Sequence, residues 1–382
     1  MDTRGAGIAQ VACLACLALV RAAPHIVGTR YVYIVGHWHG GTGFVARAFH
    51  IQDAFGPGAL CTCRGHQGEA KYCMAPARTP YRYNFDPRNG PSMSNMTHVT
   101  LVKRLRFYCG DGARAFYVLK NPQIGTPAAL SSSGDWTGEV DPWGVRGHAD
   151  LGRWVELLGV QETTVVIVLR HPYTLYPFDA KYKCSGAGRC LSLWADALLL
   201  ALEPLLRLRV RLVAMVRFED CIHHSDLLTR GILSASMEEA AGESSPPYAD
   251  FPRRLPFHKW FTQGREDMFE NAMESVQGQI PSSVTRYSQF MGDYFGYNLV
   301  LPNHSRLDPL KPLSLSRVLV PTNAPNKTTV LFAGSRRHPV NATTFSSIVS
   351  TLLEMSGAPH VKKAFISTIR SLSSVHRRKK RK

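Results

Sequence analysis

The sequence has few acidic residues, no long apolar run and no internal repeat. Asp and Glu number 28 against 45 Lys and Arg, which gives a formal net charge of +17 over 382 residues. Charged residues make up 19% and apolar residues 45%, a balance that excludes wholesale disorder. The absence of repeats excludes a solenoid or propeller. Six of the positive charges lie in the tail 377–382, and the basic remainder suits an anionic ligand, an acidic polymer or a membrane surface.

No apolar run reaches the roughly 20 residues of an ordinary membrane-spanning helix. The mostly apolar stretch 6–20 follows Arg4 and precedes small residues around Ala22, a pattern typical of a secretory signal peptide. We therefore expect residues 1–23 to direct the chain into the secretory pathway, to the Golgi or ER lumen or outside the cell, and we expect no nucleic-acid partner. The alternative is an uncleaved signal-anchor, which would give membrane association through the N-terminus.

Glycosylation sequons and cysteines favour the same compartment. Four Asn-x-Ser/Thr sequons begin at Asn95, Asn303, Asn326 and Asn341. Seven of the nine cysteines follow the predicted signal, and in an oxidising lumen we expect some of them to pair. The nearest local pair is Cys184 and Cys190. A second group is Cys61, Cys63 and Cys73, for which a zinc site with His66 is the alternative, but Cys-x-Cys is not a usual zinc spacing and we expect no metal.

Short β-branched and aromatic runs alternate with helix-length segments. The predicted strands are 30–36, 113–119, 163–169 and 210–218, and the predicted helices are 42–50, 191–206, 285–299 and an amphipathic stretch near 345–369. This order indicates an α/β fold with a doubly wound parallel sheet and helices on both faces. We place the core domain at 24–300, with a long insertion at 51–110, and a C-terminal extension with the basic tail at 301–382.

In such a sheet, ligands bind beyond the carboxyl ends of the strands, so the residues after each strand are the candidate site. The first strand ends in a glycine-bounded turn that leads into a helix, with the sequence Gly36-His37-Trp38-His39-Gly40-Gly41-Thr42. Backbone N–H groups of such a turn and the dipole of the following helix attract an anion. The turn nearly matches the nucleotide loop G-x-x-x-x-G-K-[ST], without its Lys. We predict a phosphate-binding loop here; the alternative is a plain turn that needs glycine.

Segments after successive strands resemble the sulfotransferases that use 3′-phosphoadenosine 5′-phosphosulfate (PAPS) as donor, and the broad carbohydrate and protein-tyrosine branch in particular. The turn itself resembles that family's 5′-phosphosulfate loop, written as basic residue, small residue, Gly, Thr. The later matches are Val118-Leu119-Lys120-Asn121-Pro122, Leu169-Arg170-His171-Pro172, Val216-Arg217-Phe218-Glu219-Asp220 and Phe295-Gly296-Tyr297. The resemblance covers about residues 30 to 300, in the family's order.

The resemblance implies a role for each matching residue. The loop amides with Thr42 would hold the 5′-phosphate, Arg170 the 3′-phosphate, and protonated His39 or Lys120 would neutralise the leaving oxygen, with no metal. Lys120 as a solvated strand-end lysine is the alternative for that residue. The alternative for Arg170 is a structural ion pair with Glu219 or Asp220, acidic residues to which we assign a bracing role.

The sequence departs from the family pattern at three points. His39 replaces the usual Lys or Arg, so its charge depends on pH. Phe178 stands where a serine usually follows the second-loop Arg, and Lys181 and Lys183 are either substitutes or ordinary surface lysines. No catalytic base is identifiable by motif; the candidates are Asp53, Glu69 and His98.

The function predicted from the sequence is sulfuryl transfer from PAPS to a hydroxyl or amine of a carbohydrate or protein. One alternative is another P-loop-like transferase such as a kinase, against which the missing Lys and the lack of a magnesium-binding Asp motif count. The other is a non-catalytic relative that binds acidic glycans. The last four residues, Lys379-Lys380-Arg381-Lys382, match a dilysine retrieval pattern or form a basic arm for polyanion contact.

Overall fold

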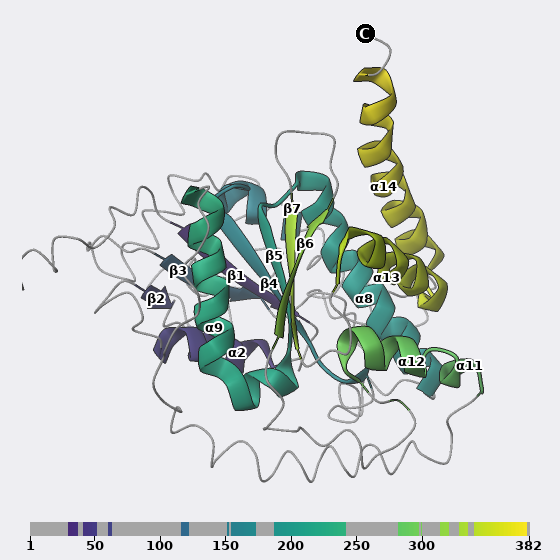
Figure 1. Cartoon of the computed structure of the whole chain (residues 1–382), viewed down its shortest axis with the longest axis horizontal. Coiled ribbons are helices and arrows are strands. Elements are labelled where there is room, and N and C mark those ends of the chain that lie inside the picture. Colours follow the sequence, from purple (N-terminus) through teal and green to yellow (C-terminus); the bar gives the residue numbers. More distant parts are fainter. Residues whose placement is uncertain are drawn as a thin grey trace, which may run out of the picture.

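The computed structural model describes residues 30–36, 41–51, 60–62, 116–121, 151–152, 154–172, 187–241, 282–297, 299, 314–320, 328–334 and 340–379. Within these residues the protein is an α/β structure around one mixed, mostly parallel sheet (Figure 1). The strands are β1 (Arg30–Gly36), β2 (Leu60–Thr62), β3 (Phe116–Asn121), β4 (Thr163–Leu169), β5 (Leu212–Arg217), β6 (Ser314–Val320) and β7 (Thr328–Gly334). The main helices are α2 (Thr42–Ile51), α8 (Ala187–Leu208), α9 (Phe218–Ala241), α13 (Ala342–Met355) and α14 (Pro359–Lys379).

The strands lie in the order β2-β3-β1-β4-β5-β7-β6. All neighbours pair in parallel except β6 and β7, which are antiparallel. The expectation of a wholly parallel sheet is therefore wrong at this edge. A parallel neighbour needs a crossover of a dozen residues or more, whereas β6 ends at Val320 and β7 begins at Thr328.

Side chains of the central strands alternate between two hydrophobic cores, one on each face of the sheet. In β1, Tyr31 and Tyr33 belong to the larger core with residues of α8, α13 and α14, whereas Val32 and Ile34 belong to the smaller core with residues of α2 and α9. Successive side chains of a strand point to opposite faces, so a run that is apolar throughout must be covered on both. Figure 1 shows α2 and α9 on one side of the sheet and α8 and α13 on the other.

Residues beyond 300, which we set apart as a C-terminal extension, share this sheet and core. β7 pairs with β5, and α13 and α14 pack against α8. The amphipathic stretch near 345–369 is two helices, because α13 ends before Ser356 and α14 begins at Pro359. The helix predicted at 285–299 is three short elements, α11 (Ser282–Thr285), α12 (Ser288–Phe290) and the π-helical turn η4 (Met291–Phe295).

The carboxyl ends of β1, β4 and β5 lie side by side at the centre of the sheet, where Val168 is the register partner of Gly36 and Arg217 that of Leu169. α2 follows β1 and α9 follows β5 directly, so both helices begin at this edge. In the part of the chain that the structure describes, no helix is both long and apolar enough to span a membrane.

Candidate functional site

Two glycines close the turn between β1 and α2, and neither has room for a side chain. A Cβ added at Gly36 would lie 2.9 Å from both Thr42 Cγ2 and the carbonyl oxygen of Val168. Gly41 has a φ of +90°, and a Cβ there would lie 2.7 Å from Cγ of Phe218. The carbonyl of Gly41 accepts hydrogen bonds from the N–H groups of Phe44 and Val45, at 2.9 and 3.1 Å, which start α2. Close packing at both ends of the turn therefore requires glycine at these two positions.

The ring of Phe218, the first residue of α9, is the point where the turn meets the end of β4. Besides its contact with Gly41, the ring makes an edge contact with Phe44, with centroids 5.8 Å apart. The guanidinium of Arg170 lies 5.1 Å from the centroid of the Phe218 ring. One side chain thus holds the β1–α2 turn and the buried Arg170 at the same edge of the sheet.

The backbone just after β4 is held from two helices. The indole N–H of Trp194 in α8 donates to the carbonyl of Arg170 at 3.0 Å. The N–H of His171 donates to Glu219 Oε1 in α9 at 2.8 Å. Both hydrogen bonds are buried, so the direction in which the chain leaves β4 at Arg170 is fixed by groups on both faces of the sheet.

A buried polar network links the end of β5 to the π-helical turn. Arg217 forms a bidentate ion pair with Asp220, in which Nε donates to Oδ2 at 2.7 Å and Nη2 donates to Oδ1. Its Nη1 donates to the carbonyl of Gly296 at 2.7 Å. The hydroxyl of Tyr297 donates to Glu219 Oε2 at 3.2 Å. The segment 291–297 is thereby attached to the same edge that carries Arg170.

Burial and opposite charges set the protonation of this network. Burial raises the pKa of Glu219, and the charges of Arg217 and Arg170 act in the opposite direction. Burial alone lowers the pKa of Arg217, but the hydrogen bonds and charge of Asp220 raise it above its usual range overall. Burial, with the charge of Glu219, raises the pKa of Tyr297. Arg217 is therefore a permanent cation committed to protein groups, and Glu219 is a carboxyl that gains a proton more readily than an exposed one.

The structure brings together part of the predicted site. Gly36, Gly41, Thr42 and Arg170 converge at one edge, with Thr42 buried at the start of α2. Glu219 and Asp220 accept hydrogen bonds that brace the strand ends, and the charge of Arg170 acts on Glu219. Lys120 lies in β3 as the register partner of Ile34, and its side chain is outside the described part of the structure.

Other predicted residues lie outside the described residues. They are His37, Trp38, His39 and Gly40 of the turn, Asp53, Glu69, His98, Phe178, Lys181, Lys183 and Cys184. Cys190 is in a disulfide bond, and Cys221 is a buried free thiol. Among the residues that are described, no three His, Cys, Asp or Glu side chains lie close enough to hold a metal ion.

Sequence reasoning missed two residues that organise the site. Phe218 was noted only as part of a motif, and its contacts with Gly41 and Arg170 depend on three strand ends meeting. Trp194 lies within an apolar helix, and no local pattern indicates that its N–H binds the carbonyl of Arg170, 24 residues earlier. Comparison with models of protein families found no family that matches this chain, and a search of curated proteins found no match either.

Proposed function

We propose that this chain is a PAPS-dependent sulfotransferase of the secretory pathway, with a doubly wound core and a phosphate-binding loop after β1. It transfers a sulfuryl group to a hydroxyl or amine of a carbohydrate or protein acceptor. One observation carries the proposal: the Phe218 ring contacts both Gly41 of the β1–α2 turn and the guanidinium of Arg170. The two segments that the family resemblance assigns to the 5′- and 3′-phosphates of one donor are therefore neighbours.

The chemistry needs little beyond positioning and positive charge. The acceptor oxygen or nitrogen attacks sulfur, the bond from sulfur to the 5′-phosphate oxygen breaks, and adenosine 3′,5′-bisphosphate leaves while the acceptor gives up its proton. Amides of the turn and Thr42 hold the 5′-phosphate at the start of α2. Arg170 holds the 3′-phosphate, and His39 or Lys120 neutralises the leaving oxygen.

The donor assignment is tested by titrating PAPS and its 3′-dephospho analogue, adenosine 5′-phosphosulfate. Arg170→Ala should weaken PAPS binding by about 2–4 kcal/mol, the order for losing a charge-assisted bidentate contact in a closed site. Binding of the analogue should hardly change, because it lacks the phosphate that Arg170 holds.

Arg217→Lys is the matched control. Arg217 is also a buried arginine at a strand end, where it forms hydrogen bonds with Asp220 and with the backbone carbonyls of Phe295 and Gly296. The ratio of the two donor affinities should stay at the wild-type value in this variant. Partial unfolding would lower the apparent affinity for both ligands by the same factor, so it would leave this ratio unchanged. Equal losses of both ligands in Arg170→Ala would mean that Arg170 is only structural and would contradict the donor assignment.

A further inference from the structure

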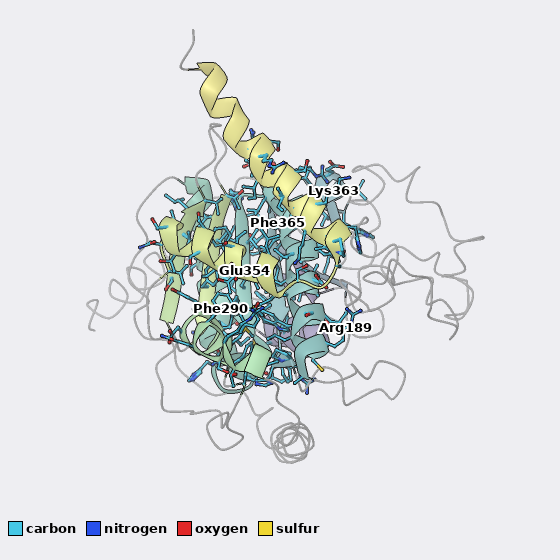
Figure 2. All side chains as sticks on the ribbon, turned by 90° about the vertical axis from the view of Figure 1, so that its right-hand side faces the viewer. Arg189, Phe290, Glu354, Lys363 and Phe365 are labelled. Carbon is cyan, nitrogen blue, oxygen red and sulfur yellow. The ribbon has the colours of Figure 1, made fainter. Side chains whose placement is uncertain are left out.

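Helix α14 is basic and carries no acidic residue along its 21 residues. One side of it is buried against the body of the protein, through Val361, Phe365, Thr368 and Leu372. Its partner there is α8, whose Glu203 accepts a hydrogen bond from Thr368 at 2.6 Å. Figure 2 looks onto α13 and α14, and in both figures the C-terminal turns of α14 extend beyond the sheet and the other helices.

The opposite side of α14 carries basic residues. Lys363 and Arg370 are exposed, and the small residue between them, Ser367, is exposed as well. Seven residues are close to two helical turns, so Lys363 and Arg370 share one face at a separation of about 10 Å along the axis. We call these two residues the basic stripe.

Few acidic groups oppose the stripe among the described residues near it. Glu203 lies on the buried side of α14, where it is engaged by Thr368 and by Arg207. Glu354, on α13, is exposed (Figure 2). Basic side chains in the last turns also suit the negative end of the helix dipole, but that effect does not reach Lys363, which lies in the second turn.

We propose that the basic stripe binds a linear anionic polysaccharide, sulfated or carboxylated, outside the donor site. A lysine and an arginine about two turns apart match a slender chain that carries anionic groups at regular intervals. Arginine forms a planar fork that pairs with sulfate or carboxylate oxygens. The small Ser367 between the cations allows such a chain to lie close to the helix.

Two other polyanions fit this surface less well. A helix that binds in the plane of a membrane inserts an apolar face, but that face of α14 is packed on α8, and Ile366, 36% exposed, is the one exposed large apolar side chain in the described part of α14. A helix that recognises duplex DNA enters the major groove, whereas α14 is flanked by α8 over the turns that carry Lys363 and Arg370.

The test compares two double variants of the full chain that remove equal charge. Lys363→Gln with Arg370→Gln should weaken binding of a heparin-derived oligosaccharide about tenfold at near-physiological salt. Removal of two contacts should also lower the slope of log affinity against log salt by about 1.5. The control, Arg286→Gln with Arg317→Gln, removes two exposed arginines from other elements and should leave binding within about twofold.

Three outcomes would overturn the proposal. The first is that the wild-type chain does not bind the oligosaccharide. The second is an equal loss in both double variants, which would assign binding to net charge alone. The third is that phosphatidylserine vesicles or duplex DNA bind at least as tightly with the same dependence on Lys363 and Arg370. PAPS binding should be unchanged in both double variants, so this proposal and the donor assignment fail independently.

Discussion

Replacing Asp196 should loosen the attachment of α14 to α8, and the structure allows the effect to be worked out. Asp196 is fully buried within α8. Its carboxylate accepts hydrogen bonds from the hydroxyl of Ser356, from Gly357 N–H at 3.2 Å and from Ala358 N–H at 3.3 Å. These donors precede the start of α14, so a side chain from one helix satisfies the free N–H groups at the start of another.

The expected cost of Asp196→Ala is about 3 kcal/mol of unfolding free energy. The substitution leaves the buried Ser356 hydroxyl and Ala358 N–H without this partner, and each such loss costs about 1–3 kcal/mol. Removing a desolvated carboxylate offsets part of that loss. Asp196→Asn keeps one acceptor oxygen of similar shape and should cost about 1 kcal/mol.

The pH dependence gives a second, independent signature. Burial raises the pKa of Asp196, while the hydrogen bonds from Ser356, Ala358 and Gly357 lower it in part. The folded protein therefore holds this proton more tightly than the unfolded chain. The resulting stabilisation is full below the unfolded pKa, about 3.9, and is lost as pH rises through the folded pKa. The wild type should thus lose stability relative to Asp196→Asn as pH rises across that window.

Urea unfolding of the wild type and both variants, repeated from pH 3.5 upward, measures both effects. A cost below about 1 kcal/mol for Asp196→Ala would refute the hydrogen-bond reasoning. A wild-type advantage over Asp196→Asn that grows with pH would refute the sign of the pKa argument.

Two further substitutions test the packing of the candidate site by the same unfolding assay. Gly41→Ala should lower the free energy of unfolding by about 2 kcal/mol or more, because φ is +90° there and the added Cβ meets the Phe218 ring. Adding Phe218→Leu should recover only the part of this loss that comes from the overlap with the ring. If the double variant regained all of the lost unfolding free energy, the positive φ at position 41 would not be destabilising for alanine. Asp220→Asn should cost about 3–5 kcal/mol by leaving the buried Arg217 cation unbalanced, and adding Arg217→Met should restore part of it. A single-variant cost under about 1 kcal/mol would show that the pair is solvated.

Strands with uniform apolar sequence were predictable, because their pattern does not depend on their neighbours. The predicted bounds 30–36 and 163–169 match β1 and β4, and the helix expected from Thr42 is α2. β6 and β7 were missed, since each is a short run in a region dominated by Pro, Ser and Asn. β7 is specified by pairing with β5, a contact more than 100 residues away in the sequence.

Part of the candidate site could also be predicted from the sequence. Gly36 ends β1, and Gly41 and Arg170 come shortly after strands; the edge of a parallel sheet brings strand ends together whatever their order in the chain. The break between α13 and α14 was locally encoded by Gly357 and Pro359, but the amphipathic pattern on either side concealed it. The role of Asp196 was not locally encoded, because it depends on α8 lying against this break.

The buried charges at the edge of the sheet bear on the anion site that we propose there. A buried ion pair is weak evidence for stability, because its desolvation cost offsets most of the attraction, so such groups are better understood as positioning devices. Arg217 and Asp220 balance one another and hold η4 in place. Burial raises the pKa of Glu219, and the charges of Arg217 and Arg170 lower it in part. With Glu219 protonated, these four side chains sum to a single positive charge. An anion bound beside Arg170 would raise the pKa of Glu219 further, so the edge gains positive character as an anionic ligand arrives.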